Sequence, residues 1–194
     1  MSGYTGTQAE CAYSYGGAST NLATFTTEDN LLKTYPLCQI PGSIFGLGAG
    51  LGAESKTLRI SAGGQVGATA TPTFTFSLRI FTANPAWSVG GILLGSSNAM
   101  TATSGVTLGT WTMEGHITLR TAPVVNGTAT IVTMAGIGGN GFSLPGSMPV
   151  AGTSPAVATW SVDTVYYLYL SAACSASSAS NLINTQYLKV YGDN

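Results

Sequence analysis

The sequence predicts an all-β protein, built as one antiparallel sandwich or barrel of seven or eight strands. Apolar and polar residues alternate along several segments, which is the period of a half-buried strand, and helical periodicity is almost absent. Clusters of Gly, Pro, Asn and Ser separate these segments at fairly regular spacing. With 194 residues, the chain is long enough to bury a self-sufficient core.

Two segments show the alternation most clearly. Residues 73–80 read TFTFSLRI, with Phe, Phe, Leu and Ile on one face and Thr, Thr, Ser and Arg on the other. Residues 110–120 read TWTMEGHITLR and place Trp111 and Met113 on the inner face, with His116 on the outer face. Such one-sided strands are typical of a sheet with one face on the core and one in water.

Shorter segments predict further strands. They are rich in β-branched and aromatic residues and span residues 57–62, 89–94, 128–134, 165–173 and 186–191. The fourth of these differs, because its Tyr166, Tyr167 and Tyr169 direct large side chains to both faces. A strand with two apolar faces is either central in its sheet or covered by another subunit, so Tyr167 is a candidate interface residue.

Charge is unusually scarce. Only 7% of the residues are charged, against about 25% in an average domain. The polar surface must come from 27 Thr and 20 Ser, and the net charge is −1. Such a surface is either an ordinary hydroxyl-rich solvent face or one that copies of the chain or partners cover, and we expect the second.

Several partner classes are disfavoured. The six basic residues are scattered without a patch, so we expect no nucleic acid. No apolar run approaches the roughly 18 residues of a membrane span, and the start MSGYTGTQAE lacks the features of a signal peptide. The three cysteines, Cys11, Cys38 and Cys174, have no metal-like spacing; we expect reduced thiols, with a disulfide between two of them left open.

The first residues differ from the rest. Residues 1–21 lack sustained alternation, and they predict an extended N-terminal arm, followed by a sandwich domain over residues 22–194. A disordered terminus is the alternative. Free tails seldom carry so many aromatics, so we expect the arm to dock on a neighbouring subunit or partner. Its candidate contact residues are Tyr4, Tyr13 and Tyr15, and residues 22–32 are expected to form the first strand of the domain.

No motif indicates catalysis, a cofactor or a metal. His116 is the single histidine, and its neighbours Glu114 and Thr118 lie on an exposed sheet face. Residues 136–141 (GIGGNG) match G-x-G-x-x-G, but the following FSLPGSMPVAG cannot form the helix that a dinucleotide site requires. Glu28 and Asp29 are adjacent and point in opposite directions. We therefore expect a protein that is not an enzyme.

The order of segments resembles the jelly-roll structural domains of tailed bacteriophages, found in capsid decoration (cement) proteins and in tail or head appendages. The resemblance covers residues 35–194. It rests on CQIPGSIF at 38–45, LRISAGG at 58–64, TFTFSLRI at 73–80, GGILLG at 90–95, the strand at 111–120, Val162-Asp163 before a long strand, and LKVY at 188–191.

The resemblance implies an antiparallel jelly-roll β-sandwich that forms homotrimers and binds the major capsid protein. The expected function is a capsid decoration protein on the exterior of the virion, made in the host cytoplasm, that stabilises the shell. A tail, baseplate or head appendage remains an alternative, although such proteins are usually longer. A glycan-binding jelly-roll module is the alternative from a different class.

Overall fold

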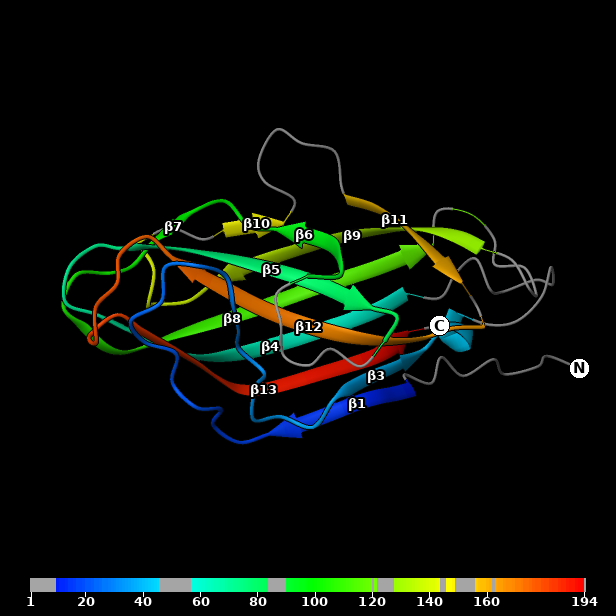
Figure 1. Cartoon of the computed structure of the whole chain (residues 1–194), viewed down its shortest axis with the longest axis horizontal. Coiled ribbons are helices and arrows are strands. Elements are labelled where there is room, and N and C mark those ends of the chain that lie inside the picture. Colours follow the sequence, from blue (N-terminus) through cyan, green and yellow to red (C-terminus); the bar gives the residue numbers. More distant parts are fainter. Residues whose placement is uncertain are drawn as a thin grey trace, which may run out of the picture.

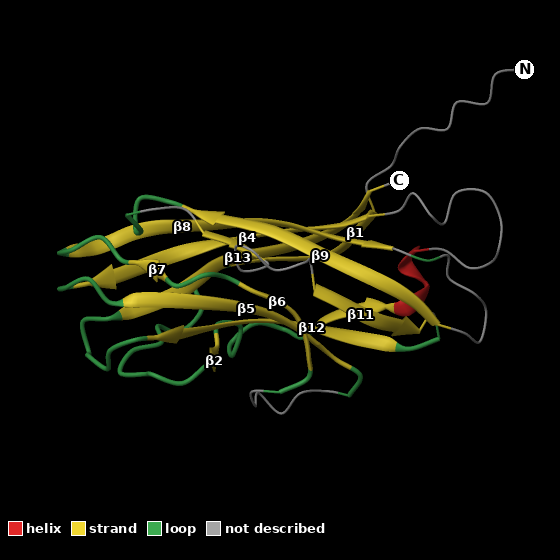
Figure 2. Cartoon of the chain, turned by 90° about the horizontal axis from the view of Figure 1, so that it is seen from above, coloured by secondary structure: helices red, strands yellow, loops and turns green. Residues whose placement is uncertain are grey.

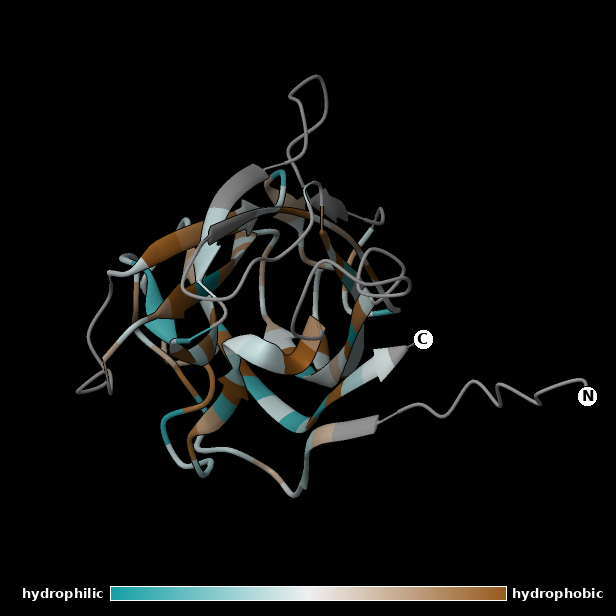
Figure 3. Ribbon diagram, turned by 90° about the vertical axis from the view of Figure 1, so that its right-hand side faces the viewer, coloured by the Kyte–Doolittle hydropathy of each residue, from teal (hydrophilic) through white to brown (hydrophobic). Residues whose placement is uncertain are grey.

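The computed structural model of this chain describes residues 10–45, 57–83, 90–119, 121, 128–143, 146–148, 156–161 and 163–193. All strand pairings within them are antiparallel, and the strands form two sheets, A and B, that lie face to face (Figure 1, Figure 2). Seen from one end, both sheets curve around a shared interior (Figure 3). The predicted all-β, antiparallel class is confirmed.

Sheet A has the strand order β1-β13-β4-β8-β9-β10, and β11 pairs with a different part of β9. Its long central strands carry mainly large apolar residues inward, among them Ile60, Trp111 and Leu188, and mainly polar residues outward. The strands are β1 (Glu10–Gly16), β4 (Thr57–Ala68), β8 (Val106–Leu119), β9 (Thr128–Gly138), β10 (Gly146–Met148), β11 (Ala156–Ser161) and β13 (Leu182–Asp193).

Sheet B has the order β2-β12-β5-β6, with β3 also pairing with β12 and β7 with β5. β12 therefore lies between β5 on one side and the short strands β2 and β3 on the other. The strands are β2 (Asp29–Asn30), β3 (Cys38–Pro41), β5 (Thr73–Phe81), β6 (Ile92–Ser96), β7 (Met100–Thr101) and β12 (Val165–Cys174), and a 3-10 turn, η1 (Gly42–Phe45), follows β3.

The core fills the space between the sheets. Phe76 of sheet B and Trp111 of sheet A are both fully buried, with ring centroids 5.0 Å apart. Trp111 Nε1 donates to the carbonyl of Asn184 at 2.9 Å, and Trp160 Nε1 donates to that of Gly42 at 2.9 Å. Both indole N–H groups are thus satisfied inside the protein, which lets these large side chains be buried at no polar cost.

Strands lie at all seven predicted segments. β4, β8, β9 and β13 extend beyond the predicted bounds, and β6 begins at Ile92 rather than Val89. The expected strand at residues 22–32 is reduced to the two-residue β2 and one bridge between Leu22 and Ile183. A turn follows β2 directly and ends the pairing, because Asn30 Oδ1 accepts a hydrogen bond from the backbone N–H of Leu32 at 2.7 Å.

The described part of the predicted arm belongs to the sandwich. Residues 10–16 form β1, the edge strand of sheet A, which pairs with β13 from Glu10–Gly192 to Gly16–Tyr187. Backbone hydrogen bonds from Gly17 to Gln186 and from Ser19 to Thr185 continue this contact. The chain therefore has no structural break at residue 21, and residues 1–9 lie outside the described residues.

Candidate interaction surfaces

The N-terminal tyrosines with described side chains fasten β1 to the body of their own chain. Tyr13 Oη donates to the carbonyl of Pro36 at 2.7 Å, and the rings of Tyr15 and Tyr35 lie 4.4 Å apart. Tyr35 Oη donates to the carbonyl of Gly17 at 2.6 Å. Burial, with a smaller contribution from Tyr15, raises the pKa of Tyr35 to about 12. Tyr4, the third candidate, lies outside the described residues.

A buried ion pair joins the segment before β2 to the outer face of sheet B. The guanidinium of Arg79 binds the carboxylate of Glu28 through two hydrogen bonds, of 2.7 and 2.8 Å, and both side chains are less than 20% exposed. Ser171 Oγ donates to the same carboxylate. Burial alone would raise the pKa of Glu28, but the hydrogen bonds and the charge of Arg79 outweigh it and lower this pKa.

The two-sided aromatic strand is central, one of the two arrangements that the sequence allows. Tyr166 faces the core and stacks on Trp160, with centroids 4.0 Å apart. Tyr169 points to the outer face but is only 1% exposed, because Phe81 and the Glu28–Arg79 pair lie beside it. The chain therefore covers this part of β12 by itself.

Tyr167 lies at the other end of this outer face, near several apolar side chains. Its cross-strand neighbours are Gln39 on β3 and Phe81 on β5, and Val165 precedes it on the same face. Leu93 pairs with Arg79, two residues before Phe81. Val165 is 44% and Leu93 43% exposed, while Tyr167 and Phe81 are half-buried. We call Phe81, Leu93, Val165 and Tyr167 the Tyr167 patch.

The outer face of sheet A has a different character. Cross-strand pairing across β13, β4 and β8 forms three rows on this face. No described loop crosses the middle of this layer in Figure 2. The rows are Tyr191–Arg59–His116, Lys189–Ser61–Glu114 and Tyr187–Gly63–Thr112, and we call these nine residues the polar face of sheet A.

Hydrogen bonds connect the centre of the polar face. Ser61 Oγ donates to one oxygen of Glu114 at 2.5 Å, and Arg59 Nε donates to the other at 3.4 Å. The side chains of Arg59 and Glu114 are about half exposed, at 52% and 50%. His116 is exposed on the same strand as Glu114, as the sequence predicts. The ion pair is thus long and open to solvent, unlike that of Glu28.

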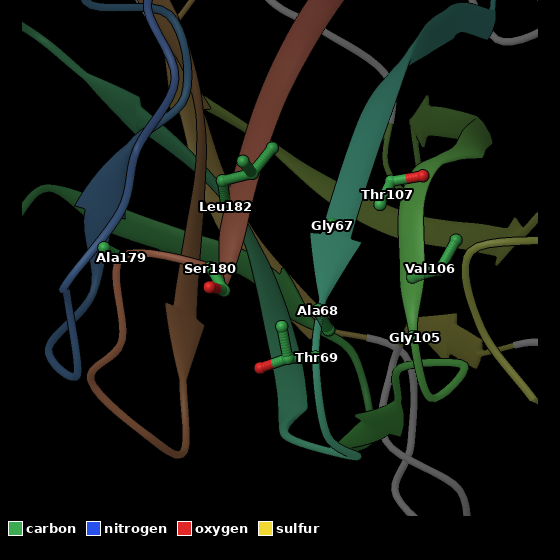
Figure 4. Close-up of a pocket in the computed structure, with 9 residues that line it drawn as sticks. All are labelled: Gly67, Ala68, Thr69, Gly105, Val106, Thr107, Ala179, Ser180 and Leu182. Atoms are coloured by element: carbon green, nitrogen blue, oxygen red, sulfur yellow. The ribbon is translucent and has the colours of Figure 1, made fainter.

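A cleft of about 320 Å³ lies at one end of the sandwich, where the β4–β5, β7–β8 and β12–β13 turns meet (Figure 4). It offers hydroxyl and methyl groups without a charged side chain, so its lining has no group for acid–base chemistry. The lining residues are Gly67, Ala68, Thr69, Gly105, Val106, Thr107, Ala179, Ser180 and Leu182.

The remaining sequence motifs are structural where they are described. Residues 136–138 are the end of β9 and residues 139–141 form a turn, so the glycine-rich motif does not precede a helix. Glu28 and Asp29 bind different partners, Arg79 and Lys33. Among the described residues, no three His, Cys, Asp or Glu side chains are grouped so that they could hold a metal, and no helix is long and apolar enough to cross a membrane.

Sequence reasoning did not single out Tyr187 and Tyr191 as candidate contact residues. The signal was available, because the alternation of QYLKVY puts both tyrosines on the face opposite Leu188 and Val190. The sequence does not predict the exposure of Leu93 and Val165. Their exposure depends on where β6 and β12 begin relative to the neighbouring strands.

Comparison of the chain with models of protein families, with curated proteins and with solved structures gives no match.

Proposed function

We propose that the two sheets form a jelly roll and that the protein is a non-catalytic capsid decoration protein of a bacteriophage. In a jelly roll, one long antiparallel ribbon folds so that successive strand pairs alternate between two sheets. The strand order supports this reading: β1–β13 and β4–β8 pair in sheet A, while β3–β12 and β5–β6 pair in sheet B. β9, β10 and β11, which lie between β8 and β12 in the sequence, add further strands to sheet A beside β8.

The observation that carries the functional proposal is the Tyr167 patch. Large exposed apolar side chains gathered around an aromatic residue are typical of protein–protein contacts, where aromatic anchors supply much of the binding energy. Because only 7% of the residues are charged, electrostatic repulsion between copies of the chain is weak. We propose that the patch joins copies of the chain into a homotrimer.

In this proposal the trimer sits on the capsid exterior and bridges copies of the major capsid protein. Residues 1–9, with Tyr4, are the proposed capsid contact. Tyr13 and Tyr15 take a different role from the one that the sequence suggests, because their contacts hold β1 in place. They therefore act by holding β1 at the edge of sheet A.

The oligomeric state tests the patch. Light scattering after size exclusion should give three times 19.7 kDa for the wild type. Leu93→Ser and Val165→Ser should raise the dissociation constant of the trimer at least about tenfold, since each removes an exposed apolar side chain. Leu108→Ser is the matched control, because Leu108 is 67% exposed on sheet A. A monomeric wild type, or trimers unaffected by both changes, would overturn this assignment.

Location tests the decoration role separately. Antibodies against the folded protein should label the heads of intact phage particles in immunogold electron microscopy. Labelling of tails alone would favour the appendage alternative, and particles without label would refute a virion role.

A further inference from the structure

We propose that the polar face of sheet A binds a neutral glycan chain. The inference is independent of the capsid proposal, because it rests on a different sheet. It starts from Tyr187, whose cross-strand neighbours on both sides are glycines, Gly16 on β1 and Gly63 on β4. Neither neighbour has a side chain to flank the aromatic ring.

Tyr187 uses this space and lies over Gly63. An ideal Cβ at position 63 would stand only 2.7 Å from Cε1 and 3.0 Å from Cζ of the Tyr187 ring. The ring therefore occupies the place of a side chain and leans across β4, while remaining half-buried rather than fully covered. A tyrosine held against a sheet in this way is a preorganised platform, since little side-chain freedom remains to be lost when a ligand stacks on it.

Polar groups suited to sugar hydroxyls surround this platform. Thr112 lies in the same row, and Ser61, Glu114 and Arg59 lie in the next two rows, about 7 Å apart along a strand. Among the described residues, Arg59 contacts Glu114 through Nε at 3.4 Å, and no described side chain binds its terminal N–H groups. Donors and acceptors thus alternate beside an aromatic ring whose electron-rich face attracts the C–H groups of a sugar ring.

Tyr191 extends the site along β13. It lies four residues from Tyr187 on the same face, a distance of roughly 13 Å, and directly opposite Arg59. Two aromatic rings at this spacing span more than one sugar unit, so the site fits an oligosaccharide or polysaccharide rather than a monosaccharide.

The composition of the face favours a glycan over a protein. Protein interfaces are depleted of charged residues at their centre, whereas the middle row here contains Lys189, Ser61 and Glu114. The apolar Tyr167 patch on sheet B has the character of a protein contact instead. The face carries two basic side chains, Arg59 and Lys189, against the one carboxylate of Glu114, which lies at the centre and pairs with Arg59. Because little net charge remains, we propose a neutral glycan, and hyaluronan tests the acidic one.

Affinity electrophoresis of the full chain tests the proposal. Native gels would contain hydroxyethylcellulose, galactomannan, amylopectin or dextran, with hyaluronan as the acidic polysaccharide. We expect retardation by at least one neutral polymer, and an affinity at least about tenfold lower for Tyr187→Leu and for Tyr191→Leu. Tyr187→Phe keeps the ring and should retain most of the affinity. Tyr167→Leu, the same change on sheet B, should bind as the wild type does.

Three results would overturn the glycan site: no retardation by any of the four neutral polymers, retardation unchanged in Tyr187→Leu, or binding to hyaluronan alone that high salt removes. If Tyr187→Leu instead weakened trimer formation or head binding, the polar face would be a protein contact. Thermal unfolding of each variant distinguishes these outcomes from a loss of folding. Because Leu93→Ser and Val165→Ser leave the polar face untouched, failure of the trimer proposal would not affect this test.

Discussion

Glu28 connects the segment before β2 to two strands of sheet B. Its carboxylate accepts two hydrogen bonds from Arg79 on β5 and one from Ser171 on β12. Next to it, Tyr169 is shielded from solvent, and burial raises the pKa of its hydroxyl. This ion pair is therefore a fixed part of the structure, whereas the half-exposed pair of Arg59 and Glu114 is open to solvent and to ligands.

We expect Glu28→Gln to lower the free energy of unfolding by about 2 kcal/mol at pH 7, since it leaves the guanidinium of Arg79 half-buried without its counter-charge. The effect should depend on pH. Because the pKa of folded Glu28 lies below its usual 4.5, the stabilisation is fully present above about pH 4.5 and is lost as the pH falls through the folded-state pKa. The gap between variant and wild type should therefore shrink in acid.

Urea unfolding at pH 7 and at several values below pH 4.5 measures this gap. Glu114→Gln is the control, because the same substitution in a half-exposed pair should change stability by less than about 1 kcal/mol. A gap for Glu28→Gln that stays constant down to pH 3 would contradict the role of the carboxylate charge.

Two cysteines are free and buried. Cys38 pairs with Leu168, and Cys174 lies six residues further along the same strand, so their Cα atoms are roughly 20 Å apart, far beyond the reach of a disulfide. Burial raises the pKa of both thiols. In the folded protein both thiols should therefore be poor nucleophiles.

Thiol labelling with Ellman's reagent checks this in a Cys11→Ser background. We expect two thiols to react in guanidinium chloride, and reaction in native buffer to be at least about a hundredfold slower, since it requires opening of the core. Fast labelling of either thiol in native buffer would contradict the burial of β3 or of the end of β12.

The alternation of apolar and polar residues determined which strands could be predicted from the sequence. β5 and β8 have one apolar and one polar face, so their sequence periods identify them directly. β1 shows this signal only briefly, because Tyr13 and Tyr15 are its only large side chains, and its pairing partner β13 lies far along the sequence. β11 is equally hidden, because it pairs with β9 through residues next to a Pro- and Gly-rich stretch.

The interaction surfaces were less predictable for the same reason. Tyr167 was found from its own strand, but the patch around it needs Leu93, which only the register of β5 and β6 brings near. The polar face likewise depends on register: Gly63 is one of many glycines until pairing sets it opposite Tyr187.

The fastening of β1 can be tested at Tyr35, whose hydroxyl donates to the carbonyl of Gly17 just after β1. Tyr35→Phe should cost about 1 kcal/mol of stability, the usual loss for one buried hydrogen bond. Tyr167→Phe is the control and should change stability by less than about 0.5 kcal/mol, because the Tyr167 hydroxyl makes no hydrogen bond to the described residues. Equal losses of stability in Tyr35→Phe and Tyr167→Phe, measured by thermal unfolding, would contradict the role of Tyr35 in holding β1.

In the whole molecule, the two outer faces divide the surface between two kinds of contact. Sheet B presents the Tyr167 patch, and the polar face of sheet A presents hydroxyls, charges and two tyrosine rings, while the exposed Leu108 and Met134 lie elsewhere on sheet A. Because the faces point away from one another, a partner on one leaves the other free (Figure 2). Assembly and ligand binding can then occur in the same molecule.

The pairing of β1 with β13 also has a consequence for biosynthesis. β1 leaves the ribosome before the other described strands, but its strand partner among them begins at Leu182, so this edge of sheet A cannot form until β13 has emerged. Contacts between such distant segments form slowly. A nascent chain stalled before Leu182 lacks the strand that joins β1 to β4, and its open edges are free to pair with other unfinished chains. We therefore expect a pause in translation before β13 to favour aggregation of this protein more than a pause after it.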